Sequence, residues 1–192
     1  KKPFLGACSR TFLRSPPIFV RSLFFGSGPH PLIDGAAKRG RPDRVAPLAQ
    51  LFVAFCAQFP LSGFSGEEPG PATFGSLRLE TPDTNDGKEL SGLTRALAPR
   101  LAIALRERGV PCVPDEGVAT APGANLHALF IDGANAYVGA SVAPWASRWM
   151  MGIPRLRMPG GAPSRSTLKL AEAFVTFLGD REAELLRPGM RA

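Results

Sequence analysis

The sequence has few of the side chains that build metal centres and disulfide frameworks. Its three cysteines, Cys8, Cys56 and Cys112, are odd in number and far apart, which predicts free thiols in a reducing compartment. Its two histidines, His30 and His127, give no metal-ligand spacing. The sequence therefore favours a cytoplasmic protein with neither a bound metal nor a disulfide.

Long hydrophobic runs are also scarce. Residues 18–25 (IFVRSLFF) are too short for a membrane span or a signal sequence, and Arg21 interrupts them. An apolar fraction of 44% is still sufficient for a buried core, while 21 glycines and 20 prolines predict long loops. We expect a soluble α+β protein that makes no membrane contact and is a monomer.

Acidic residues are missing from one long stretch, although the whole chain has a net charge of +7. No Asp or Glu lies between Asp132 and Glu172. The stretch contains all the tyrosine and tryptophan and five cations: Tyr137, Trp145, Trp149, Arg148, Arg155, Arg157, Arg165 and Lys169. Because cations neutralise phosphates and aromatic rings stack on bases, this predicts a contact with single-stranded or loop RNA. A coding bias toward arginine, and tryptophans that pack a linker onto a domain, stay open as alternatives.

Alternating apolar residues predict the strands. Residues 18–25 read as a strand and the segment that follows as a loop. Residues 75–81 alternate leucines with polar residues, as in a half-buried strand. "GVPCVP" predicts a short buried strand or connector, and residues 125–142 predict a hairpin around Asp132 and Gly133.

Helical spacing predicts three helical regions. The first covers 44–58 after a cap region at Asp43 and precedes a loop over 60–74. The second begins at a capping box formed by Asp86 and Glu89. Its leucine stripe consists of Leu90, Leu93, Leu97, Leu101 and Leu105, and Pro99 should divide it into two pieces.

The third helix starts near 164–166 after an extended, proline-punctuated linker. Pre-proline restriction keeps that linker out of helical conformation. The residues that this helix is expected to bury are Leu168, Leu170, Ala173, Phe174 and Phe177. Its N-terminus should offer free backbone N–H groups to an anion.

Four stretches resemble one family in the same order. Residues 151–174, "MGIPRLRMPGGAPSRSTLKLAEAF", are similar to the junction in the bacterial large-subunit 23S rRNA (cytidine) 2′-O-ribose methyltransferase M family. "IFVRSLFF" resembles the last strand of that family's ferredoxin-like domain. "LRLETPDTNDGKEL" with "PRLAIALRERGV", and "HALFIDGANAYVGAS", resemble its THUMP domain, an RNA-binding module.

The resemblance implies four segments. Residues 1–43 would be a partial ferredoxin-like domain and loop, and 44–143 a THUMP domain. Residues 144–163 would be a basic linker, and 164–192 the first helix of a Rossmann-like methyltransferase domain.

The resemblance also implies particular site residues. Lys169 matches the first lysine of the family's Lys–Asp–Lys–Glu tetrad, and Ser166 a position near the methionine end of S-adenosyl-L-methionine. A lysine ammonium there would orient a ribose 2′-hydroxyl and favour its alkoxide-like form. Candidate contacts to large-subunit rRNA are Lys88, Arg95, Arg100, Arg148, Arg155, Arg157 and Arg165.

The resemblance is incomplete, because the family's cofactor loop and the other three tetrad residues have no counterpart in the chain. We expect an RNA-recruiting portion that does not itself transfer methyl groups. Two alternatives stay open. One is a THUMP-type RNA adaptor without methyltransferase activity. The other is a chain that cannot fold alone and exposes the apolar face of its last helix.

Overall fold

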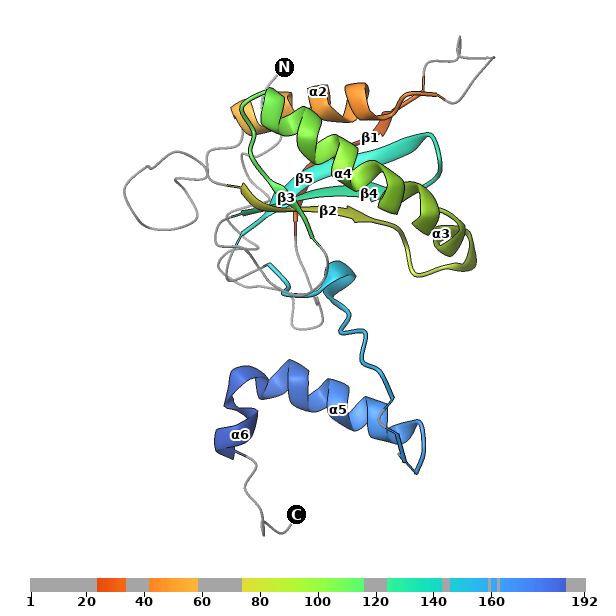
Figure 1. Ribbon diagram of the computed structural model, residues 1–192, viewed down its shortest axis with the longest axis vertical. Helices are drawn as coiled ribbons and strands as arrows, with labels where there is room; N and C mark the ends of the chain where they lie inside the picture. Colours follow the sequence, from red (N-terminus) through yellow and green to blue (C-terminus); the bar gives the residue numbers. More distant parts are fainter. Residues whose placement is uncertain are drawn as a thin grey trace. The chain divides into compact units, whose positions relative to one another are not determined.

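The computed structural model describes residues 24–33, 42–58, 74–115, 124–142, 146–158, 160–161 and 163–185. They belong to two compact units, one ending at Met151 and the other beginning at Gly152 (Figure 1). The first unit combines a five-stranded sheet with helices, which agrees with the predicted mixture of helices and strands. The predicted loop over 60–74 lies, except for Phe74, outside the described residues.

The sheet has the strand order β1-β5-β4-β2-β3. The strands are β1 (Phe25–Pro31), β2 (Phe74–Glu80), β3 (Val113–Pro114), β4 (Ala124–Phe130) and β5 (Asn135–Ser141). β5 pairs antiparallel with both β1 and β4, whereas β2 pairs parallel with β3 and β4. The predicted hairpin is confirmed, and Asp132 Oδ1 closes its turn by accepting the Ala134 and Asn135 amides, each at 2.7 Å.

The first strand lies later in the sequence than predicted. Residues 18–23 are outside the described part, and the segment expected to be a loop forms β1 at the edge of the sheet. Proline is tolerated there because an edge strand leaves some N–H positions unpaired. The register of β1 against β5 shifts between Ser27 and His30, where Pro29 interrupts the ladder.

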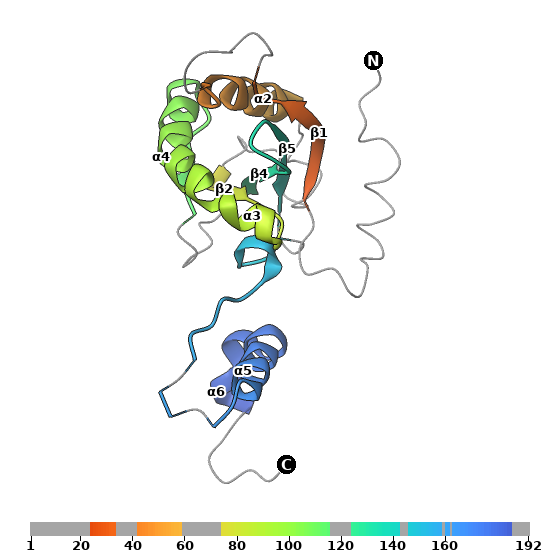
Figure 2. The same ribbon diagram turned by 90° about the vertical axis from the view of Figure 1, so that its right-hand side faces the viewer.

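Two helices cover one face of the sheet, side by side in both views (Figures 1 and 2). They are α2 (Val45–Gln58) and α4 (Ser91–Glu107). The cap predicted at Asp43 is confirmed, since its Oδ1 accepts the Val45 amide at 2.9 Å. The core between these layers includes Leu48, Phe52, Leu77, Leu79, Leu97, Leu101, Leu105, Leu126, Phe130 and Val138.

The leucine-rich helix differs from its prediction at both capping and continuity. The N-cap of α3 (Asn85–Glu89) is Thr84, whose Oγ1 accepts the Gly87 amide at 3.0 Å, so the predicted Asp86–Glu89 box is wrong. α4 runs unbroken through Pro99, and the division falls instead at Leu90. Pro99 is exposed, and burial of the leucines on the opposite side outweighs the hydrogen bond that it removes.

The strand predicted over 75–81 is confirmed as β2, but it is buried on both faces. Ser76, Arg78 and Glu80 were expected to meet solvent, and their exposed fractions are 3%, 0% and 5%. Residues 147–151 cover that face and explain the difference, since Arg78 donates to the Ser147 carbonyl and Glu80 accepts the Met151 amide. The short strand β3 shows the reverse, with Val113 55% exposed.

The second unit contains α5 (Ser166–Phe177), a 3-10 turn η3 (Gly179–Arg181) and α6 (Glu182–Leu185). The predicted start of the last helix is confirmed, and residues 153–158 before it have no regular structure. Its predicted burial is wrong, because α5 has no buried residue. Leu170 and Phe177 are 55% and 83% exposed, and Leu168, Ala173 and Phe174 are intermediate.

Candidate nucleic-acid interface

Three of the predicted RNA contacts lie on neighbouring helices of the first unit. Lys88 is in the last turn of α3, and Arg95 and Arg100 are on α4. All three side chains are exposed, whereas Leu97 and Leu101 of the same helix are buried in the core. The amphipathic pattern of α4 therefore directs its cations away from the sheet.

A fourth candidate, Arg148, belongs to a segment that follows β5, residues 146–151, which we call the strap. The exposed Arg148 places its guanidinium carbon 5.7 Å from the ring centroid of half-buried Trp149, within the range of a cation–π contact. Trp145 lies outside the described residues. Trp149 thus belongs to the first unit and is half-buried there, as expected if it packs the linker onto the domain. It also forms part of the surface of that unit.

The remaining candidates belong to the second unit. Arg155 and Arg157 are exposed on the extended segment, and Arg165, Ser166 and Lys169 are exposed around the start of α5. The expected free amides there have local partners. Ser166 N donates to Ser164 Oγ at 3.2 Å, and the next two amides donate to main-chain oxygens at 3.1–3.2 Å.

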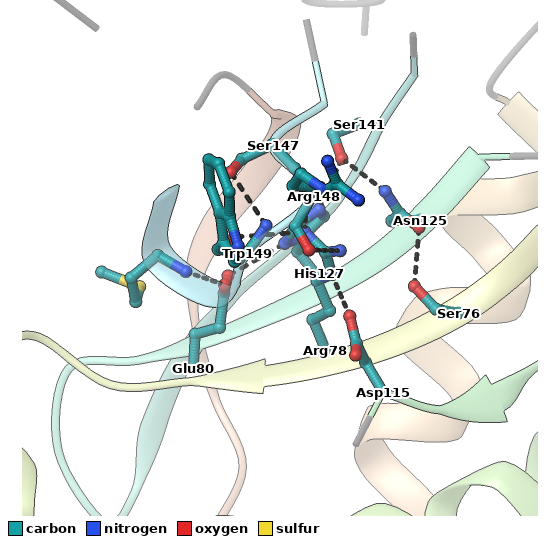
Figure 3. Close-up of polar contacts among 11 residues, drawn as sticks. Ser76, Arg78, Glu80, Asp115, Asn125, His127, Ser141, Ser147, Arg148 and Trp149 are labelled. Carbon is teal, nitrogen blue, oxygen red and sulfur yellow. Dashed lines mark hydrogen bonds and ion pairs between the residues drawn. The ribbon is translucent and has the colours of Figure 1, made fainter. Parts of the chain in front are cut away.

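A buried polar network lies on the sheet face opposite the helices (Figure 3). We use this name for Ser76, Arg78, Glu80, Asp115, Asn125, His127 and Ser141. Arg78 Nε donates to Asp115 Oδ2 at 2.5 Å, with both side chains shielded from solvent. Arg78 Nη1 donates to the Ser147 carbonyl at 2.7 Å, and longer contacts of 3.5 Å reach the next two carbonyls of the strap.

The rest of the network forms a continuous chain of hydrogen bonds. Glu80 Oε1 accepts the Met151 amide at 2.6 Å, and its Oε2 lies 2.9 Å from His127 Nδ1. Because a carboxylate only accepts, Nδ1 is the donor, and the other ring nitrogen, Nε2, lies 2.7 Å from Ser141 Oγ. The chain continues through Asn125 to Ser76, with bonds of 3.5 and 2.6 Å.

The side chains of Glu80, His127 and Ser141 are hydrogen-bonded in the order of a hydrolase catalytic triad. Their surroundings exclude nucleophilic catalysis by Ser141. Ser141 is 0% and His127 1% exposed, so no substrate reaches the hydroxyl. Phe24 stacks on His127 with ring centroids 5.3 Å apart. Gly139, opposite His127 on β5, allows β1 to approach closely, since a Cβ there would overlap the Phe25 carbonyl oxygen and lie 2.8 Å from the Phe24 ring.

Electrostatics support a structural role for the network. Burial alone would raise the pKa of Glu80, but the hydrogen bond and charge of His127, the Met151 amide and Arg78 together lower it below its ordinary value of 4.5. Every buried side-chain nitrogen or oxygen in the described part of the chain has a hydrogen-bond partner. The network is therefore complete within the protein.

Cysteine and metal chemistry find no support in the described ranges. Burial raises the pKa of Cys56 and Cys112 to about 11, which keeps both free thiols protonated and unreactive at neutral pH. No cluster of three or more potential metal ligands occurs among the residues that the structure describes. None of the described helices is both long and apolar enough to cross a membrane.

The network escaped sequence interpretation because its polar residues resemble a solvated strand face. Ser76, Arg78 and Glu80 alternate along β2, and Asn125 and His127 share one face of β4. A signal was available, because two adjacent strands each carry hydrogen-bonding residues at alternate positions. Such a coincidence is typical of a covered polar layer.

The first unit is a mixed α/β domain whose described helices and strap carry exposed cations. The chain belongs to the ribosomal RNA large subunit methyltransferase M family. The family model described as "Ribosomal RNA large subunit methyltransferase M, N-terminal" matches residues 43–142, just over half of the chain.

Curated relatives carry the name "Ribosomal RNA large subunit methyltransferase M". The relative from Azoarcus sp. (strain BH72) is 37% identical over 177 residues, covering 92% of this chain and 42% of the relative. The protein from Laribacter hongkongensis is 44% identical over 121 residues, covering 62% and 32% respectively. The protein from Shewanella denitrificans is 37% identical over 176 residues, covering 91% and 41%. The chain thus spans less than half the length of these relatives.

Proposed function

We propose that this chain is the RNA-recruiting portion of an S-adenosyl-L-methionine-dependent enzyme that methylates the 2′-hydroxyl of a cytidine in large-subunit rRNA. The observation that carries the proposal is family membership, combined with exposed cations on α3, α4 and the strap. In this interpretation, residues 44–143 form a THUMP domain after a partial ferredoxin-like piece. The chain would act in the cytoplasm as a monomer.

The exposed cations would bind RNA phosphates. If about five phosphates are engaged, the logarithm of affinity should fall with the logarithm of salt concentration at a slope of roughly −3.5 to −4.5. Fluorescence anisotropy with a labelled single-stranded rRNA segment measures this slope. Replacing Arg95 and Arg100 together by Gln should lower its magnitude by about 1.4 to 1.8. A flat salt response in the unaltered chain would remove the RNA-binding proposal.

Methyl transfer would require a downstream domain in addition to Lys169 and Ser166. The cofactor would supply the methyl group, while the Lys169 ammonium would orient the ribose hydroxyl and Ser166 would contact the cofactor's methionine end. Both side chains are exposed on α5, which leaves them accessible to such a partner surface. We expect that the chain alone does not methylate rRNA, because its sequence has no counterpart of the family's cofactor loop or of the other three tetrad residues.

The test of the catalytic role uses a protein that carries this chain together with its downstream domain. Lys169→Met should abolish transfer of a labelled methyl group to rRNA and leave RNA affinity within a factor of two. Equal activity of the variant and the parent would rule out the role of Lys169. An inactive parent that still binds RNA would favour the adaptor alternative.

A further inference from the structure

Two buried charged side chains, Arg78 and Glu80, form hydrogen bonds with the main chain of the strap. The carbonyls of residues 147–149 face the Arg78 guanidinium, and the Met151 amide donates to Glu80. Burial of an arginine or a glutamate is costly unless its partners are well placed. Here those partners include main-chain atoms of a single surface segment, which indicates that the two charges position that segment.

The strap ends in a fixed backbone turn. Met151 has a φ of 53°, a left-handed conformation that non-glycine residues rarely adopt, and Gly152 follows with a φ of 68°. The bond from the Met151 amide to Glu80 stabilises this turn. Trp149 N also donates to Ser147 Oγ at 3.1 Å, so the strap has defined geometry between its two attachment points.

The outer side of the strap presents the Arg148–Trp149 pair. Arg148 is exposed, and its planar guanidinium lies over the half-buried indole. A flat cation on an aromatic ring combines a stacking surface for a base with a charge for the adjoining phosphate. No acidic residue occurs in the sequence from 133 to 171.

We propose that Arg148 and Trp149 form a stacking subsite for an unpaired RNA base, and that Arg78 and Glu80 are the positioning residues that hold it. This proposal rests on the RNA-binding function proposed above and adds the base contact to it. The exposed cations of α3 and α4 would bind the phosphate backbone, whereas the strap would recognise a base that is not paired.

Tryptophan fluorescence tests the contact directly in the full chain. The sequence has two tryptophans, so Trp145→Phe leaves Trp149 as the sole indole emitter. A short single-stranded RNA of mixed sequence should quench this emission in a saturable manner. Inorganic polyphosphate of matched charge should bind with similar salt dependence and leave the emission unchanged, because it has no bases.

Surface variants separate stacking from charge. Trp149→Ala should weaken RNA affinity about tenfold without changing the salt slope. Arg148→Gln should lower the magnitude of that slope by about 0.7, as expected for one phosphate of a single strand. Neither variant removes a buried group of the network, so far-UV circular dichroism should match the parent.

A buried variant tests the positioning role. Glu80→Gln should reduce both the RNA-induced quenching and the RNA affinity, yet leave polyphosphate affinity equal to that of Glu89→Gln, a matched change of an exposed residue on α3. The double variant Glu80→Gln/Trp149→Ala should bind RNA no more weakly than Trp149→Ala alone, since both changes remove the same contact.

Each outcome has a separate meaning. Salt-dependent RNA binding with unchanged Trp149 emission, or with full affinity in Trp149→Ala, overturns the subsite and leaves the proposed function standing. Identical behaviour of Glu80→Gln and Glu89→Gln overturns the positioning role. Absence of RNA binding by the unaltered chain overturns both proposals. Should Glu80→Gln fail to fold, the two surface variants still decide the subsite.

Discussion

The two units of the chain differ in how far they bury helices of similar amphipathic pattern. In the first unit, α4 buries its leucine stripe against the sheet, with Leu101 and Leu105 both 0% exposed. In the second unit, α5 has a comparable apolar stripe, yet no residue of it is buried. The comparison shows that amphipathic spacing predicts a helix and its apolar side, whereas burial depends on the presence of an opposing surface.

Charged and polar side chains show the same difference in burial between the two units. The first unit encloses an ion pair and a chain of hydrogen bonds beneath the strap, with donors and acceptors matched. The ion pair described in the second unit, Arg181 with Glu184 at 3.5 Å, is more than 60% exposed on both sides. Because exposed pairs contribute little to stability, the first unit should account for nearly all of the cooperative unfolding transition.

The largest expected effect comes from breaking the buried ion pair. Arg78→Met should destabilise the first unit by about 3–5 kcal/mol, because the buried Asp115 carboxylate loses the Arg78 guanidinium and the strap carbonyls lose their donor. Urea unfolding monitored by circular dichroism measures the loss. Arg100→Met, at an exposed position of α4, should change stability by less than about 0.5 kcal/mol. Equal effects of the two variants would contradict the buried network.

A matched pair of leucines tests the comparison directly. Leu101→Ala should cost about 3 kcal/mol, because it leaves a cavity between α4 and the sheet. Leu170→Ala, the same change at a 55% exposed position of α5, should cost less than about 0.5 kcal/mol. Urea unfolding of both variants provides the measurement. A loss above 1 kcal/mol for Leu170→Ala would mean that α5 is buried in solution.

Local sequence signals predicted much of the fold. The helix after Asp43, the hairpin closed by Asp132 and the start of α5 depend on short-range patterns, and all three are confirmed. β1 was missed because glycines and prolines dominate it. Its strand conformation comes from pairing with β5, a contact between residues more than a hundred positions apart.

The buried network was harder to predict for the same physical reason. Arg78 and Glu80 have the spacing of a solvated strand face, and in the described part of the chain residues 146–151 return to cover them. The predicted RNA contacts depend instead on charge and exposure. The structure places all seven predicted cations on the surface, but their contact with RNA remains a prediction.

The dependence of stability on acidic pH distinguishes the buried Glu80 carboxylate from carboxylates on the surface. The pKa of Glu80 is lowered in the folded state, so its carboxylate stabilises the fold at pH values above its unfolded-state pKa. That contribution is lost as the pH falls below the ordinary value of 4.5 through the lower folded-state pKa. Arg78 and His127 face this carboxylate, and Asp115 shares Arg78 with it.

Glu80→Gln should therefore flatten the decline in stability between about pH 5 and pH 3 relative to the parent. Urea midpoints across this range measure the slope. Glu89→Gln removes an exposed carboxyl from α3 and should retain the parental slope. If both variants decline like the parent, the Glu80 carboxylate does not contribute to folding as the contacts indicate.

The smallest expected effect comes from removing the second unit's helices. A chain that ends at Met158 retains the sheet, α2, α4, the strap and every residue of the buried network. Its urea midpoint and m-value should stay close to those of the full chain, because α5 has no fully buried residue and its half-buried side chains would add little to m. Solubility should improve, since the truncation removes the exposed Leu170 and Phe177. A free energy of unfolding lowered by more than about 1 kcal/mol, at unchanged m, would instead show that α5 helps to keep the first unit folded.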